Sequence, residues 1–202
     1  MNFKRHDLVW LDLEFEYSSE LRDWVMQKLP CVVTRQTNLT NSYLNVAWCD
    51  GVNKQLSRHS ELVPIEKIIL HSAPLSLVKT VSLFAESVVF GKQIRKLELL
   101  NFKPCVYGSF SWQILTKKSY IHPDSDLDIL LHITTHYQLE QIVSLLDDLA
   151  VACRRHIDGE LIFPDGSAIA WREWFSDSEK VLYKGFSEVG FTHRNILLEQ
   201  LA

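Results

Sequence analysis

The chain has 202 residues, of which 47% are hydrophobic, and it carries six tryptophans and a formal net charge of −4 at pH 7. This length suits one domain or two small ones, and the apolar fraction excludes a disordered protein. The mildly negative charge argues against a nucleic-acid partner, because general nucleic-acid binders normally carry a basic stripe.

Cysteine usage and hydropathy predict the compartment. The cysteines are widely separated, with no Cys-x-x-Cys pair and no secretory leader, so we expect neither a disulfide framework nor structural zinc. Lys79, Glu86 and Lys92 interrupt the longest apolar stretch, which is then too short to span a bilayer. We therefore expect a cytoplasmic protein with no membrane partner.

The first part of the chain, residues 1–70, is expected to form a small α+β domain. Its predicted elements are a strand within 5–15, a helix from Ser18 or Ser19 to Leu29, and a hairpin of 31–36 with 43–50. His6 and Asp7 are expected to be satisfied by local hydrogen bonds. Arg35 and Arg58 are expected to be solvated surface side chains.

Residues 71–202 are expected to form the catalytic domain, in which strands and helices alternate. The predicted elements are a helix or helix pair over 74–100, a strand, turn and helix from 106, a strand through 126–131, a helix over 137–155, and a hairpin of 157–163 with 167–174. The fold class that follows is α+β, with a mixed sheet flanked by helices.

Residues 107–132 carry the clearest chemical pattern. Asp126 and Asp128 are one alternation apart on an expected strand, so their carboxylates should project from the same face. Buried carboxylates repel each other, and a bound cation offsets that cost; oxygen ligands without matching His or Cys favour Mg²⁺. Gly108-Ser109, followed by a helix start, offers N–H groups and a hydroxyl to phosphate. An ordinary turn and solvated strand-edge acids are the alternative, which the joint occurrence of these parts disfavours.

The order of these parts resembles a known superfamily. Gly108-Ser109 followed by Asp126-x-Asp128 on a strand is similar to the signature of the DNA polymerase beta-like nucleotidyltransferases. Longer segments resemble the phosphoribosyl-dephospho-CoA transferase of malonate decarboxylase, the holo-acyl carrier protein synthase of that system. These segments are RHDLVWL at 5–11, VYGSFSWQILTKKSYIHPDSDLDILL at 106–131, IDGELIFPDGSAIAWREW at 157–174 and VLYK at 181–184.

The resemblance implies a bacterial, Mg²⁺-dependent transferase. Its donor would be 2'-(5''-triphosphoribosyl)-3'-dephospho-CoA, its acceptor a serine of the malonate decarboxylase acyl carrier protein subunit, and diphosphate would leave. Asp126 and Asp128 would hold Mg²⁺ against the triphosphate, and Gly108 and Ser109 would bind its outer phosphates, with Ser125 close by. Two rivals stay open, namely another nucleotidyltransferase acting on a small molecule, protein or RNA, and a catalytically silent binding module of the same fold.

A third acidic residue is implied by the superfamily, and the sequence offers several. Asp158 and Glu160 share one face of an expected strand, and either would bind the second metal and act as general base; we favour Asp158, with Glu160 close behind. Glu173 is expected to pair with Arg172 or Arg194 at the surface.

Positive charge and stacking complete the implied site. Phosphoryl transfer needs cations near the departing phosphates, because negative charge builds on the leaving group. Lys184 is the first choice, and Arg172 and Lys118 are weaker candidates. Trp112 is expected either to stack on an adenine or to lie in the core.

Overall fold

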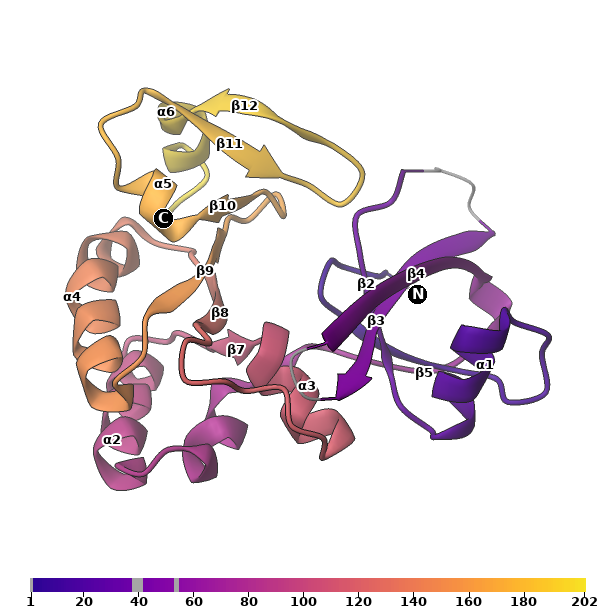
Figure 1. Cartoon of the computed structure of the whole chain (residues 1–202). Helices are drawn as coiled ribbons and strands as arrows, with labels where there is room; N and C mark the ends of the chain where they lie inside the picture. The colour runs from indigo at the N-terminus through magenta and orange to yellow at the C-terminus, as the bar shows by residue number, and fades with distance from the viewer. Residues whose placement is uncertain (1, 38–41, 53–54) are drawn as a thin grey trace.

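The computed structural model describes residues 2–37, 42–52 and 55–202. The described residues form two β-sheets, of five and seven strands, with helices packed against each (Figure 1). This arrangement confirms the expected α+β class. Among the described residues, no helix combines the length and the apolar character needed to cross a bilayer.

The N-terminal sheet has the strand order β4-β3-β2-β1-β5. Its elements are β1 (Leu8–Leu11), α1 (Ser19–Met26), β2 (Cys31–Val33), β3 (Tyr43–Val52), β4 (Gln55–Pro64), the 3-10 turn η1 (Ile65–Lys67) and β5 (Ile68–Ser72). The Ser18 hydroxyl accepts a hydrogen bond from the Leu21 amide, so the expected N-cap of α1 is confirmed. The antiparallel pair β2–β3 confirms the predicted hairpin, whereas the long hairpin β3–β4 was not predicted.

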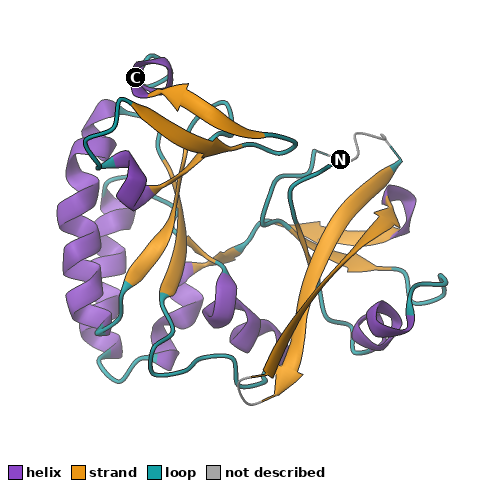
Figure 2. Cartoon of the chain, turned by 45° about the horizontal axis from the view of Figure 1, so that its top comes forward, coloured by secondary structure: helices purple, strands orange, loops and turns teal. Residues whose placement is uncertain are grey.

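The second sheet has the order β12-β11-β10-β9-β8-β7-β6. Its strands are β6 (Leu75–Ser76), β7 (Cys105–Val106), β8 (Leu127–His132), β9 (Ile157–Ile162), β10 (Ala168–Ala170), β11 (Lys180–Lys184) and β12 (Val189–His193). Its helices are η2 (Leu77–Leu83), α2 (Ser87–Leu99), α3 (Gly108–Thr116), α4 (His136–Cys153), α5 (Trp171–Trp174) and α6 (Arg194–Leu198). Helix α4 connects β8 to β9, which pair in parallel. Figure 2 shows the long helices on the side of this sheet that faces away from the N-terminal sheet.

Three predicted elements differ from the structure. The helix expected from residue 74 becomes a 3-10 helix at 77–83, and the α-helix begins only at Ser87. The strand expected over 167–174 ends at Ala170, because Trp171 and Trp174 turn into a helical turn that buries both indoles on one side. Asp126 lies one residue before β8 rather than on it.

Aromatic side chains join the two sheets around α3. The Trp112 ring lies edge-on to Trp24 of α1, with 5.6 Å between ring centroids, and it packs on the N-terminal core. The Tyr120 hydroxyl donates to the Cys49 carbonyl of β3 at 2.6 Å, and burial raises the pKa of this phenol to about 12. These contacts hold the N-terminal sheet against the second sheet, on the side that carries the acidic residues.

Candidate active site

The Gly108 backbone passes directly against the Asp128 side chain. Gly108 begins α3 with φ +63°, and the preceding Tyr107 amide donates to the Asp128 carbonyl at 3.1 Å. A Cβ atom on Gly108 would lie 2.0 Å from Asp128 Oδ2. Only glycine combines this left-handed conformation with this approach. The Gly108 turn therefore packs directly on the Asp128 carboxylate. This packing places the first N–H groups of α3 beside Asp128.

Replacing Gly108 by alanine should destabilise the protein by about 2 to 3 kcal/mol, since it combines a left-handed alanine with a steric overlap. Chemical unfolding would measure the loss. Gly166→Ala is the matched control, because Gly166 has φ +87° but open space where the Cβ would go. This control should lose only about 1 kcal/mol. Equal losses in the two variants would contradict close packing of Gly108 on Asp128.

Asp128 and Asp158 face each other across the parallel strands β8 and β9, where their Cα atoms are register partners. Burial, followed by the charges of Asp158 and Asp126, raises the pKa of Asp128 to about 6. The Asp158 carboxylate accepts a hydrogen bond from the Gly159 amide at 2.8 Å. Asp126 and Asp158 therefore lie near enough to Asp128, beside the Gly108 turn, for their charges to act on it.

A network outside this cluster orients Asp126. His156 Nδ1 lies 3.2 Å from Asp126 Oδ1, and its Nε2 lies 2.6 Å from Arg172 Nη2. Because a guanidinium only donates, His156 Nε2 must accept and Nδ1 must carry the proton that is donated to Asp126. Arg172 is fixed in turn by the Ile157 carbonyl at 2.9 Å and by the Trp171 ring, 4.4 Å away. Arg172 thus supports Asp126 through His156.

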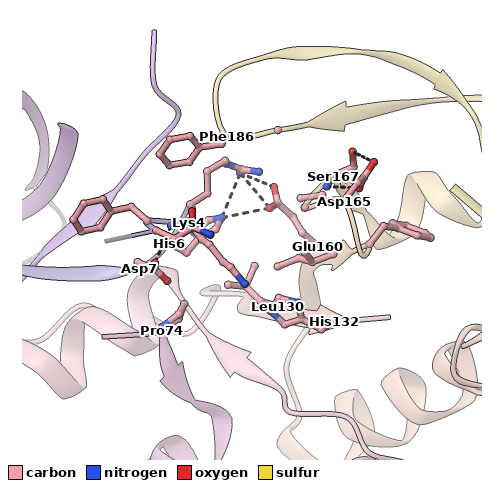
Figure 3. A pocket seen from close by; sticks show the side chains of 18 of the residues that line it. Lys4, His6, Asp7, Pro74, Leu130, His132, Glu160, Asp165, Ser167 and Phe186 are labelled. Carbon is pink, nitrogen blue, oxygen red and sulfur yellow. Dashed lines mark hydrogen bonds and ion pairs between the residues drawn. The ribbon is translucent and has the colours of Figure 1, made fainter. Parts of the chain in front are cut away.

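Glu160 lies two residues beyond Asp158 on the same face of β9, and it is 5% exposed. Its carboxylate forms ion pairs with Arg5 at 3.1 Å and Lys184 at 2.9 Å, and it lies 3.3 Å from the His6 ring nitrogen Nε2 (Figure 3 shows the contact with His6). Burial alone would raise the pKa of Glu160, but the hydrogen bond from His6 and the charge of Arg5, with Lys184, hold it well below its usual range. Glu160 and Lys184, both expected at the reaction centre, therefore lie in a network that joins the N-terminal segment to β9 and β11.

The comparison with known proteins agrees with this geometry. The model of the phosphoribosyl-dephospho-CoA transferase MdcG C-terminal domain matches residues 84–195, which is more than half of the chain. The chain belongs to this family. The match includes the whole cluster from Gly108 to Glu160, so the acidic residues lie within the region that MdcG proteins share.

Relatives named phosphoribosyl-dephospho-CoA transferase extend the similarity to the N-terminal sheet. One MdcG relative, from Xanthomonas euvesicatoria pv. vesicatoria (strain 85-10), is 31% identical over 193 residues, or 89% of each chain. One from Xanthomonas campestris pv. campestris (strain 8004) is 28% identical over 201 residues, also 89% of each chain. One from Pseudomonas putida (strain GB-1) is 42% identical over 78 residues, or 38% of this chain and 37% of that one. No solved structure matches the chain.

Other expected site residues of this chain lie in structural contacts. The Ser125 hydroxyl accepts from the His122 amide at 2.8 Å and closes the loop before β8. Lys118 pairs with Asp50 at 3.3 Å, and Trp112 packs between the two sheets. The Glu173 carboxylate accepts from the Leu182 amide at 2.7 Å rather than pairing with an arginine side chain. Ser109 remains in the first turn of α3 beside the acidic cluster.

Two residues near the site were not expected there. Arg58 of β4 lies close enough to lower the pKa of Asp128, opposing the effects of burial and the neighbouring acids. His6, with φ +69°, contacts the Tyr107 ring at 4.6 Å between centroids. The register of the β3–β4 hairpin sets the direction of Arg58, and a left-handed turn sets that of His6. The residues around His6 include no Gly or Pro that would signal this left-handed turn in the sequence.

Proposed function

We propose that this protein attaches a phosphoribosyl-dephospho-CoA group to a serine of the malonate decarboxylase acyl carrier protein subunit, with triphosphoribosyl-dephospho-CoA as donor. The supporting observation is the convergence of Asp126, Asp128 and Asp158 on the Gly108 turn within the MdcG-matched region. The serine hydroxyl oxygen attacks the phosphorus nearest the ribose, a P–O bond forms, and the P–O bond to the departing diphosphate breaks. The hydroxyl proton passes to the Asp158 carboxylate.

The chain supplies separate groups for the two ends of the triphosphate. Ser109 and the first N–H groups of α3 would bind the outer phosphates, because the N-terminus of a helix favours anions. Arg58 of the other sheet, whose charge lowers the pKa of Asp128, would stabilise the charge on the departing diphosphate. Asp158 lies on the neighbouring strand β9. The acceptor serine approaches from the side opposite the departing diphosphate, where it would meet Asp158.

The acidic cluster fits Mg²⁺. The raised pKa of Asp128 results from burial and then from the charges of Asp158 and Asp126, and a bound cation would offset both effects. Among the described residues, no three His, Cys, Asp or Glu side chains are already gathered to hold a metal ion. Mg²⁺ usually takes one or two carboxylates and completes its shell with phosphates and water, so Asp126 and Asp128 would hold it together with the donor. The ion would neutralise charge on the triphosphate.

Mg²⁺ should stabilise the protein even without substrates. At ten times its Kd, a ligand that binds only the folded state adds about 1.4 kcal/mol. Thermal unfolding with increasing MgCl2 would detect this shift in the wild type, and Asp128→Asn should lose it. Asp124→Asn is the matched control, since Asp124 is an exposed carboxylate in the loop before β8. An equal shift in all three proteins would contradict a site at Asp128.

Asp158 and Glu160 should differ sharply in catalysis. Asp158→Asn is expected to lower turnover at least 100-fold with little change in donor affinity, since it removes the general base and leaves Asp126 and Asp128 in place. Glu160→Gln should retain more turnover, because its carboxylate is occupied by ion pairs. Single-turnover kinetics with calorimetric donor titration would separate the two effects. The reverse ranking would assign the base to Glu160.

The deciding experiment is intact-mass spectrometry of the apo carrier protein subunit after incubation with donor, Mg²⁺ and this protein. We expect a mass gain equal to the phosphoribosyl-dephospho-CoA group and release of diphosphate. A carrier protein with its acceptor serine replaced by alanine is the control. No gain with this donor, but a gain of a nucleotide when ATP is supplied, would instead indicate another nucleotidyltransferase. Unchanged mass with either donor would support a silent binding module.

A further inference from the structure

A cavity of about 1040 Å³ lies beyond Glu160, between the N-terminal segment and the turn that follows β11. Residues 2–7 line one side, and Phe186 and its neighbours line the other (Figure 3). Leu130, His132 and Glu160 of β8 and β9 line the side formed by the second sheet. This volume lies at the upper end of the range for small-molecule sites and so suits a large, elongated ligand.

The cavity begins next to the acidic cluster. Glu160 lines it and lies two residues beyond Asp158 on the same strand face, a distance of about 7 Å along a strand. His6, another lining residue, contacts Tyr107, which directly precedes Gly108. A donor whose triphosphate lies at Asp128 would therefore extend its remaining part along β8 and β9 toward this cavity.

The acidic side chains that line the cavity are already paired. Asp7 accepts from His71 at 2.7 Å and from the Lys4 amide at 2.8 Å. Asp165 accepts from the Ser167 amide at 2.8 Å and from its hydroxyl at 3.0 Å. Glu160 pairs with Arg5 and Lys184 and contacts His6, and Glu188, at the rim, hydrogen-bonds to Tyr183. The carboxylates are thus occupied from within the chain.

Lys4 and Phe186 are two lining residues that could contact a ligand. Within the described residues, the Lys4 ammonium has no ion-pair or hydrogen-bond partner, although it lies near His132. Phe186 leaves 38% of its surface exposed, and its carbonyl accepts from the Gln36 amide at 2.8 Å, which ties its loop to the N-terminal sheet. A free cation and an anchored aromatic ring that line the same cavity match a diphosphate joined to a flat base.

We propose that this cavity binds the dephospho-CoA part of the donor, with Lys4 on its diphosphate and Phe186 stacked on its adenine. The assignment rests on the proposed function, because the name of the ligand comes from it. A carrier protein segment is the competing occupant. The mixed polar and apolar lining and the occupied carboxylates favour the nucleotide.

Calorimetric titration with dephospho-CoA itself, without Mg²⁺, tests the assignment. The wild type should bind it, and Lys4→Gln and Phe186→Ala should each weaken binding at least fivefold. Lys79→Gln and Phe191→Ala are matched controls, because both side chains are exposed and lie outside the cavity. These controls and Asp128→Asn should bind like the wild type.

The possible results separate this inference from the proposed function. Dephospho-CoA binding that depends on Lys4 and Phe186, without any transfer to the carrier protein, would support the cavity assignment and contradict the proposed function. Transfer with no measurable dephospho-CoA binding, or with binding unaffected by both substitutions, would overturn the assignment alone. If both substitutions instead raise KM for the carrier protein and leave dephospho-CoA affinity unchanged, the cavity is a carrier protein site and the assignment is wrong.

Discussion

Replacing Asp128 by asparagine is expected to reduce transfer to the detection limit and, at pH 7, to increase the stability of the substrate-free protein by about 1 kcal/mol. Transfer fails because asparagine supplies neither the charge nor the bidentate oxygen that holds Mg²⁺. Stability rises because the ionised carboxylate is partly buried and is repelled by Asp158 and Asp126. The intact-mass assay and urea unfolding measure the two effects.

The pH dependence provides an independent test of this explanation. The pKa of Asp128 is about 6 in the folded protein, above the ordinary value of 3.8, so the folded state takes up a proton first as pH falls. The stability difference between Asp128→Asn and wild type should therefore shrink as pH falls through about 6 and vanish near pH 4. Asp124→Asn should show no such difference. A difference independent of pH would contradict the charge repulsion.

Replacing Glu160 by glutamine should cost about 3 kcal/mol of stability, the largest loss we expect from a single conservative substitution. The carboxylate is buried and balances Arg5 and Lys184, and removing one partner of a buried pair leaves the others poorly compensated. Urea unfolding would measure the loss. Glu140→Gln, at an exposed glutamate of α4, is the matched control and should change stability by less than about 0.5 kcal/mol.

The sign of the pH effect is opposite at Glu160. Its pKa is lowered on folding, so its contribution is present at neutral pH and is lost as pH falls from the ordinary value near 4.5 toward the lower folded pKa. The stability difference between wild type and Glu160→Gln should therefore stay constant from pH 7 to 5 and shrink only in stronger acid. A constant difference down to the most acidic pH that the protein tolerates would show that packing, not charge, explains the loss.

Local patterns in the sequence predicted much of the second sheet. The alternation around Asp128, the Gly108-Ser109 turn and the apolar period of α4 each depend on neighbours within a few residues, and the structure contains all three elements. The parallel pairing of β8 with β9 places Asp158 beside Asp128. Alternation within β9 placed Asp158 and Glu160 on one face, so the sequence favoured Asp158 only narrowly.

The roles that distinguish Asp158 from Glu160 depend on residues far away in sequence. Arg5 reaches Glu160 from the other end of the chain, through a left-handed turn at His6 that carries no glycine. Arg58 approaches Asp128 only because the register of β3 and β4 carries it there. Such contacts are set by the docking of one sheet on the other, so no local pattern indicates them.

The pairing of Arg5 with Glu160 also limits how proteins of this kind can be divided or recombined. The region recognised as the MdcG C-terminal domain begins at residue 84 and so does not include Arg5, which pairs with its buried glutamate. A fragment cut at the connection between the sheets would retain Asp126, Asp128 and Asp158, but it would leave Glu160 with Lys184 alone, without Arg5, and would expose the ring of Tyr107. Chimeras that exchange the two halves between distant relatives should therefore express well only when Arg5 and Glu160 come from compatible parents.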